Sequence, residues 1–123
     1  MTTSTLYERV GGVTFFVELV DRFYDGVAGD PLLRPMYPAD LTDSRRHLAL
    51  FLMQYWGGPT TYSDERGHPR LRRRHAPHVI DDMARDRWLT HMRASLAAAT
   101  MEDEDRVALG DYLEATANQL RNA

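Results

Sequence analysis

Five histidines are the residues of this sequence best suited to acid–base or metal chemistry, because imidazole titrates near neutral pH and is the commonest metal ligand. They are His47, His68, His75, His78 and His91. No two of them stand four residues apart with a glutamate between, so the zinc-protease pattern is absent. Pro77 lies between His75 and His78 and interrupts any helix through both, which makes a two-histidine metal site a weak prediction. For each histidine taken alone, a solvated or hydrogen-bonded side chain is the default interpretation.

Missing residue types narrow the chemistry further. The 123-residue chain has no cysteine, which excludes thiolate metal sites, disulfides, cysteine nucleophiles and cofactors attached through C-x-x-C-H. All fifteen basic residues are arginine, which excludes a lysine Schiff base and a P-loop lysine. No Gly-x-Ser-x-Gly elbow occurs, so a serine triad is not supported. The net charge of −3 provides no general attraction for nucleic acid or an anionic membrane.

The most basic part of the chain is the run RLRRRH at residues 70–75. It could form a nucleic-acid patch, a clamp for the carboxylates or phosphates of a small molecule, or a solvated arginine face. The nucleic-acid patch is the least favoured, because the run is short, lacks interleaved aromatic residues and belongs to an acidic protein. The other two interpretations stay equally open.

Aromatic residues with polar groups offer a sharper indication. Buried tyrosine and tryptophan usually need a partner for the O–H or N–H group. Core packing explains each one alone, but several such donors directed at one apolar cavity would form a site for a small polar ligand. The candidates are spread over the whole chain: Phe23, Tyr24, Tyr37, Phe51, Tyr55, Tyr62 and Trp88.

The apolar residues follow helical spacing along nearly the whole sequence. This spacing predicts an all-α fold with one domain over residues 1–123. Thr5 and Glu8 are spaced as a capping box for a short opening helix that Gly11 and Gly12 end. Three prolines limit residues 31–38 to a single tight turn of helix. Main helices are expected over residues 13–28 and 42–56, after Pro77, and from near Thr100, where Thr100 and Asp103 resemble a capping pair.

Within those main helices, three-and-four spacing predicts the faces that pack together. For residues 13–28 the stripe is Val13, Phe16, Val17, Val20, Phe23, Tyr24 and Val27; the helix after Pro77 carries Ile80, Met83, Ala84, Trp88, Met92, Ser95 and Leu96. The last helix carries Leu109, Tyr112, Leu113, Thr116, Ala117 and Leu120. Four such helices suggest a bundle, but residues 59–74 have two prolines and little apolar content, which predicts a long irregular segment. A segment of that kind in so small a domain tends to be functional.

Several blocks of the sequence resemble the truncated haemoglobins, specifically group II (the O type). The core signature is matched by FLMQYWGGP at 51–59, TYS at 61–63, RGHPRLR at 66–72 and RHAP at 74–77. RFY at 22–24, YP at 37–38, D-x-WL at 86–89 and DYL at 111–113 extend the likeness over essentially all 123 residues. The resemblance implies a two-over-two helical sandwich that encloses one non-covalent haem b.

The resemblance also implies roles for individual residues. His75 matches the family's proximal histidine, whose imidazole would coordinate the iron. Tyr24, Tyr37 and Trp88 match the three polar aromatic residues of the distal pocket, on the side where a ligand binds. Ser44 falls where other globins carry a distal histidine.

Further haem contacts follow from the same match. Leu48 corresponds to the apolar distal residue one turn after Ser44. Together with His75, the residues expected to contact haem are Phe23, Leu48, Phe51, Tyr55, Tyr62, Leu71, Arg72, Trp88 and Met92. The arginine-rich segment is expected to meet the haem propionates, with His47 as a second candidate.

These matches predict reversible binding of dioxygen and other diatomic ligands, with slow release. The alternative is a redox enzyme at the same haem, performing nitric oxide dioxygenation or peroxidase-like turnover with an electron-donating reductase as partner. A helical interaction module without haem is a third class. No apolar run approaches the roughly 20 residues of a membrane span, and residues 1–12 do not resemble an export signal. We therefore expect a cytoplasmic protein, and association into a homo-oligomer stays open.

Overall fold

The computed structural model describes residues 4–76 and 78–123, leaving aside the side chains of Arg72 and Arg74. In these residues all regular structure is helical. The elements are α1 (Leu6–Val10), α2 (Val13–Ala28), the 3₁₀ helix η1 (Arg34–Met36), α3 (Thr42–Tyr55), α4 (Thr61–Arg66), α5 (Leu71–His75), α6 (Asp82–Ala98) and α7 (Asp103–Leu120). None of the described helices is long and apolar enough to cross a membrane.

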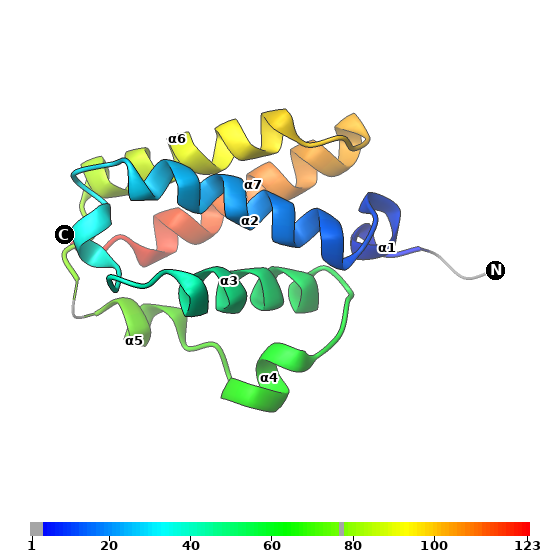
Figure 1. Cartoon of the computed structure of the whole chain (residues 1–123), viewed down its shortest axis with the longest axis horizontal. Helices are drawn as coiled ribbons and strands as arrows, with labels where there is room; N and C mark the ends of the chain where they lie inside the picture. The colour runs from blue at the N-terminus through cyan, green and yellow to red at the C-terminus, as the bar shows by residue number, and fades with distance from the viewer. Residues whose placement is uncertain (1–3, 77) are drawn as a thin grey trace.

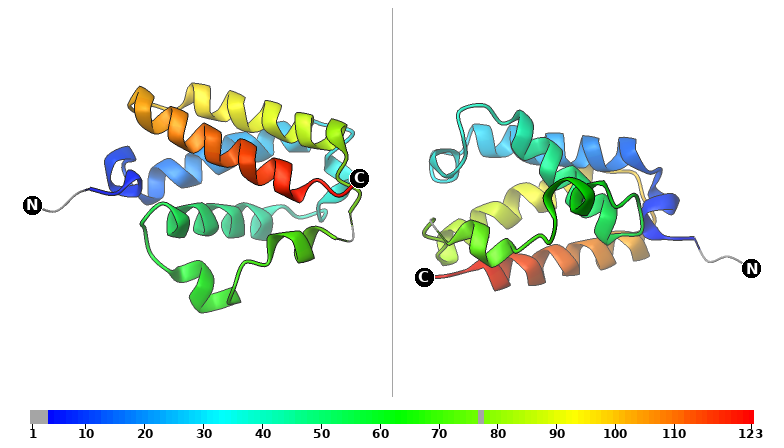
Figure 2. Two further views of the ribbon diagram at one scale, coloured as in Figure 1. Left: turned by 180° about the vertical axis from the view of Figure 1, so that it is seen from behind. Right: turned by 90° about the horizontal axis from the view of Figure 1, so that it is seen from below.

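The four long helices form two antiparallel pairs. Helix α2 runs antiparallel to α3, and α6 runs antiparallel to α7 (Figure 1). Helix α2 packs against both α3 and α6, which joins the two pairs. Helices α4 and α5 lie outside this core, on the side of α3 and α7 (Figure 2). This arrangement confirms the two-over-two helical sandwich.

The opening helix forms as the sequence predicts. The Thr5 hydroxyl accepts a hydrogen bond from the Glu8 N–H at 3.2 Å, and the Glu8 carboxylate accepts one from the Thr5 N–H at 3.2 Å. Gly11 ends the helix with a left-handed φ of 108°, a conformation that glycine adopts without steric cost. Arg9 reaches across to α7, where its guanidinium pairs with Asp105 at 2.8 Å.

Helix α2 provides the centre of the core. Phe16, Leu19 and Phe23 are each fully buried on its inner face. The predicted stripe is wrong at its outer edge, where Val13 and Val17 are 51% and 40% exposed. The inner face contains Leu19 instead, and these two valines lie beside a shallow groove between α2 and α3.

Two short helices replace the irregular segment expected over residues 59–74. Helices α4 and α5 have six and five residues, which is too short for stability by helix propensity alone. Gln54 fastens α4 to α3, since its amide group donates to the Ser63 hydroxyl at 2.7 Å and accepts from the Ser63 N–H at 2.9 Å. Tertiary contacts of this kind are invisible to periodicity, which explains the error.

The expected starts of the last two helices also need correction. Helix α6 begins at Asp82, later than the proline signal suggests, and Asp81 caps it by accepting the Ala84 N–H at 2.9 Å. Helix α7 begins at Asp103 after Glu102, so Thr100 is not its cap. The first turn of α7 contains three acidic side chains, and their negative charge stabilises the positive end of the helix dipole. Met83 is 60% exposed and does not belong to the buried face of α6.

Candidate haem site

A cavity of about 240 Å³ lies between the α2–α3 pair and the α6–α7 pair, and α5 closes one side. Its apolar lining includes Leu48 and Phe51 of α3, Leu71 of α5 and Leu120 of α7, all half-buried. The cavity is also lined by Tyr24, Tyr37, Ser44, His47, Leu52, Tyr62, Arg66, His75, Trp88, Tyr112, Leu113 and Thr116. Apolar walls with a few convergent polar groups are typical of a cofactor or ligand site.

His75 is the last residue of α5 and faces this cavity. Its Nδ1 atom lies 2.7 Å from the Leu71 carbonyl oxygen, one helical turn earlier. Because a carbonyl oxygen can only accept, this contact places the ring hydrogen on Nδ1. The Nε2 atom of the neutral ring then keeps its lone pair, which is the state that a metal ligand requires.

Three polar aromatic side chains line the same cavity. The rings of Tyr24 and Tyr37 meet edge to face with centroids 5.5 Å apart, and the Trp88 side chain lies near enough to the Tyr37 phenol to lower the pKa of that phenol slightly against the effect of burial. Burial raises the pKa of Tyr37 to about 12 and raises the pKa of Tyr24 still further. Both phenols therefore carry their hydrogen at neutral pH and can donate it.

An arginine and a neutral histidine form a pair at the edge of the cavity. The Arg66 Nη1 atom lies 3.2 Å from Nε2 of His47, and its guanidinium sits 5.9 Å from the centre of the Tyr62 ring. Burial, followed by the charge of Arg66, lowers the pKa of His47, so the imidazole is neutral and accepts from Arg66. The Nε atom of Arg66 is buried without a hydrogen-bond partner in the described part of the chain. This edge suits a carboxylate of a bound group.

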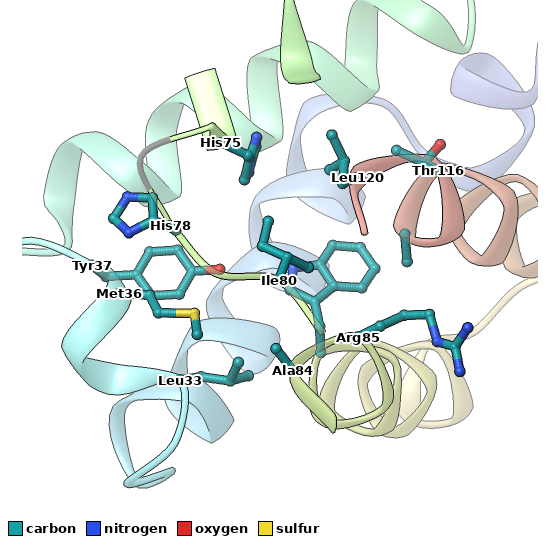
Figure 3. Close-up of a pocket in the computed structure, with 12 residues that line it drawn as sticks. Leu33, Met36, Tyr37, His75, His78, Ile80, Ala84, Arg85, Thr116 and Leu120 are labelled. Carbon is teal, nitrogen blue, oxygen red and sulfur yellow. The ribbon is translucent and has the colours of Figure 1, made fainter. Parts of the chain in front are cut away.

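A second cavity of about 250 Å³ adjoins the first. The two share Tyr37, His75, Trp88, Thr116 and Leu120 as lining residues. The second is otherwise lined by Leu33, Met36, His78, Ile80, Ala84, Arg85 and Ala117 (Figure 3). It is mainly apolar, so it extends the hydrophobic room next to His75.

The fold and this site together define a two-on-two globin, and comparisons with known proteins agree. Residues 5–122 match the family model described as bacterial-like globin. The chain is 43% identical over 116 residues to the group 2 truncated hemoglobin YjbI of Bacillus subtilis, covering 94% of this chain and 87% of that protein.

Solved structures give the same result. A thermostable hemoglobin from Thermobifida fusca superposes with a TM-score of 0.95 at 52% identity, covering 98% of each chain. A truncated oxygen-avid haemoglobin from Bacillus subtilis superposes with a TM-score of 0.91 at 42% identity, covering 97% of this chain and 100% of that one. The chain therefore belongs to the bacterial-like globins, as a group II truncated haemoglobin.

Members of this family bind non-covalent haem b, and the residues present fit that cofactor. The half-buried apolar side chains around the cavity suit a flat hydrophobic ring. The lone pair on Nε2 of His75 suits iron, and the Nε atom of half-buried Arg66, itself buried and unpaired in the described part of the chain, suits an anionic edge group. Haem chemistry implies binding of diatomic ligands.

The structure brings most of the expected contact residues to the first cavity: His75, Leu48, Phe51, Tyr62, Leu71, Trp88, Tyr24, Tyr37 and Ser44. Phe23 and Met92 are fully buried in the core and line neither cavity. Phe23 instead supports Trp88, at 5.1 Å between ring centroids. Tyr55 is 56% exposed and stacks on Tyr112, so it lies away from the cavity lining. The side chain of Arg72 lies outside the described residues.

Residue-by-residue matching missed part of the cavity wall. The expected contacts included nothing from α7, although Tyr112, Thr116 and Leu120 all line the first cavity. Their four-residue spacing on one helix face was a usable signal. Arg66 was not singled out among the arginines of its segment, because its neighbours in the sequence are polar and nothing there shows that its guanidinium turns inward towards Tyr62.

Proposed function

We propose that the chain binds dioxygen and other diatomic ligands at a haem iron held by His75, and that it releases them slowly. When bound, the haem supplies an iron atom that takes one diatomic ligand. The observation that supports the proposal is the convergence of Tyr24, Tyr37 and Trp88 on the cavity that His75 lines.

Hydrogen-bond donation by this chain accounts for the slow release. Tyr37 and Trp88 line the same cavity, and the raised pKa of Tyr37 keeps its phenolic hydrogen available for donation to a ligand. A hydrogen bond to a ligand with partial negative charge contributes about 1.5–3 kcal/mol, and each 1.4 kcal/mol is a factor of ten. Tyr24 and Trp88 share the network, so their contributions are not additive. The oxygen-avid relative from Bacillus subtilis agrees with this behaviour.

Trp88→Phe tests the proposal, because it removes the N–H group and keeps an aromatic ring. We expect dioxygen to dissociate about tenfold faster, as measured by stopped-flow absorbance. Trp56→Phe is the matched control, since Trp56 lines neither cavity. An unchanged rate in Trp88→Phe would remove the indole from the network and contradict the proposal.

A redox activity at the same haem is the second candidate, as nitric oxide dioxygenation or peroxidase-like turnover. It is supported by Tyr112, which lines the cavity and stacks on half-exposed Tyr55 with centroids 4.0 Å apart. Through this stacked pair, an electron donor such as a reductase could reach the cavity wall from the protein surface. Steady-state turnover with a physiological reductant distinguishes the two candidates, and Tyr55→Phe would slow turnover only in the redox case.

A cytoplasmic location and association into a homo-oligomer stay predictions. Slow release fits oxygen storage or chemistry better than bulk transport, because a carrier must give up its ligand readily.

A further inference from the structure

The connection between α5 and α6, residues 78–81, forms one wall of the second cavity. His78 and Ile80 line that cavity only a few residues after His75 (Figure 3). Few of the connection's own side chains are buried, since His78 and Val79 are exposed and Ile80 is half-buried. Burial of apolar surface therefore provides little to keep this wall in place.

Asn122, just beyond the end of α7, binds this connection through three hydrogen bonds. Its backbone N–H donates to the Ile80 carbonyl oxygen at 2.8 Å. Its side-chain oxygen accepts the Ile80 N–H at 2.8 Å, and its side-chain NH₂ donates to the His78 carbonyl oxygen at 2.8 Å. Both backbone polar groups of Ile80 are thus satisfied by one residue that lies 42 positions further along the chain.

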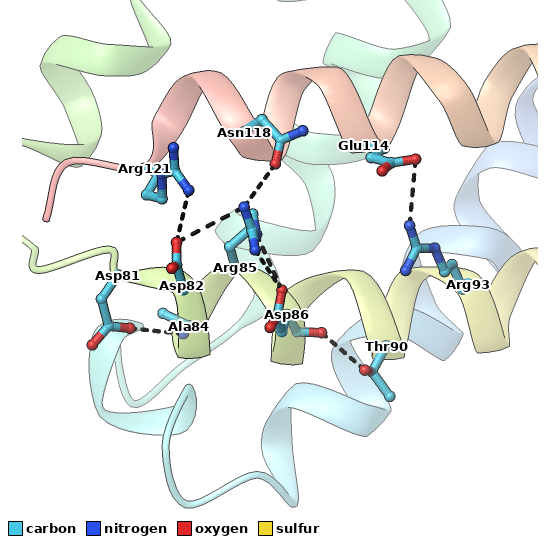
Figure 4. Close-up of polar contacts among 10 residues, drawn as sticks. All are labelled: Asp81, Asp82, Ala84, Arg85, Asp86, Thr90, Arg93, Glu114, Asn118 and Arg121. Carbon is cyan, nitrogen blue, oxygen red and sulfur yellow. Dashed lines mark hydrogen bonds and ion pairs between the residues drawn. The ribbon is translucent and has the colours of Figure 1, made fainter.

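The neighbouring residue strengthens the attachment. The Arg121 guanidinium pairs with the Asp82 carboxylate in the first turn of α6 at 2.7 Å (Figure 4). The C-terminal segment accordingly lies beside the α5–α6 connection (Figures 1 and 2).

We propose that Asn122 is a positioning residue for haem retention: it holds residues 78–81 closed over the cavity and so slows haem loss. Loss of haem requires the contact with His75 to break, and movement of residues 78–81, which follow His75 closely in the chain, would loosen that contact. The three hydrogen bonds stabilise this wall, while Thr116 and Leu120 of α7, the helix that precedes Asn122, line the same cavity. The inference rests on haem binding by the family and does not depend on the proposed ligand chemistry of Tyr24, Tyr37 and Trp88.

Asn122→Ala in the haem-loaded protein tests the proposal. It removes both side-chain hydrogen bonds and leaves the backbone bond to Ile80. We expect haem transfer to excess apomyoglobin, followed by Soret absorbance, to be on the order of tenfold faster. Asn118→Ala is the matched control, because Asn118 is an exposed asparagine four residues earlier whose side-chain oxygen accepts from Arg85 at 3.2 Å, and in the described part of the chain it makes no hydrogen bond to residues 78–81.

Amide hydrogen exchange provides a second readout that separates positioning from general destabilisation. The Ile80 amide should exchange faster in Asn122→Ala, while the amide of fully buried Leu19 should keep its wild-type rate. Haem loss within twofold of the wild type would overturn the proposal. So would faster haem loss without faster Ile80 exchange, or equal acceleration of the Ile80 and Leu19 amides.

Discussion

The two sides of the haem cavity are built in different ways. Tyr24 and Trp88 come from α2 and α6, helices of 16 and 17 residues that pack against each other. The Ser95 hydroxyl of α6 donates to the Leu19 carbonyl oxygen of α2 at 2.6 Å, inside the core. His75 stands instead at the end of a five-residue helix.

The side that carries His75 is held by hydrogen bonds between separate segments of the chain. The α5–α6 connection is attached through Asn122, and α4 is attached through Gln54. The side that carries Tyr24 and Trp88 therefore has its shape from the protein core, whereas the side that carries His75 depends on polar bonds between distant parts of the chain. Substitutions should accordingly affect ligand kinetics or overall stability on the first side, and haem binding on the second.

His75→Gly has the largest expected effect. Loss of an outer partner of a metal ligand already costs 10–100-fold in affinity, so loss of the ligand itself should weaken haem binding by more than about 100-fold. Hemin titration followed by Soret absorbance measures the affinity, and added imidazole should restore part of it. His68→Gly is the control, since His68 is exposed and lines neither cavity. A normal five-coordinate ferrous spectrum in His75→Gly would show that another residue holds the iron.

Asp30→Ala tests the side of the cavity that is formed by the core helices α2 and α6. The buried Asp30 carboxylate accepts the Leu32 N–H at 2.9 Å, lies 2.7 Å from Nε2 of His91 and pairs with Arg87 at 3.4 Å. It thereby ties the turn before η1 to α6, the helix that carries Trp88. Removing it leaves donors without a partner, so we expect chemical denaturation to show a loss of about 2–4 kcal/mol in unfolding free energy.

The matched control is Asp86→Ala, because Asp86 is exposed and pairs with Arg85 at 3.0 Å. This change should cost less than about 1 kcal/mol. Equal losses for the two variants would contradict the view that Asp30 joins the two segments.

The same carboxylate predicts a pH dependence. The hydrogen bond from His91, followed by those from the turn, holds the pKa of Asp30 below its usual value. A carboxyl with a depressed pKa stabilises the folded state fully above its unfolded pKa of about 3.9, and the contribution is lost as the pH falls through the folded value. Wild-type stability should therefore fall below about pH 4 more steeply than that of Asp30→Ala, as measured by denaturation at several pH values.

The core-built side could be predicted from sequence, because long amphipathic helices show their inner face as a stripe of apolar residues. Phe16, Val20 and Phe23 are buried as that stripe predicts. The capping box of Thr5 and Glu8 also forms, since all its contacts lie within four residues.

The other side could not be predicted in the same way. Its short helices are stabilised by bonds such as Gln54 to Ser63 and Asn122 to Ile80, which depend on three-dimensional proximity. The family match likewise led us to expect Tyr55 beside Phe51 at the haem, although the structure turns Tyr55 towards Tyr112 and solvent. The match to the globin family supplied His75; periodicity alone left it as one of five histidines.

Arg66→Ala has a smaller expected effect on haem binding. Arg66 stands at the cavity edge beside His47, where a partly exposed ion pair with a haem propionate contributes up to about 1 kcal/mol. We expect hemin affinity to fall by about two- to fivefold, with a smaller change at high salt. Arg46→Ala is the control, because Arg46 pairs with Glu65 at 2.6 Å and does not line the haem cavities. An equal loss in that variant would assign the effect to the attachment of α4 instead.

Tyr55→Ala should have the smallest effect on the haem site, because Tyr55 belongs to neither side of the cavity. Its ring stacks on Tyr112 with an interplanar angle of 29°, and aromatic pairs contribute about 0.5–1.5 kcal/mol. We expect the unfolding free energy to fall by about 1 kcal/mol and hemin affinity to stay within twofold. Tyr112 lines the cavity, so a tenfold loss of hemin affinity would mean that the stack positions Tyr112 against haem. Haem binding would then depend on the end of α3 as well as on the segments around His75.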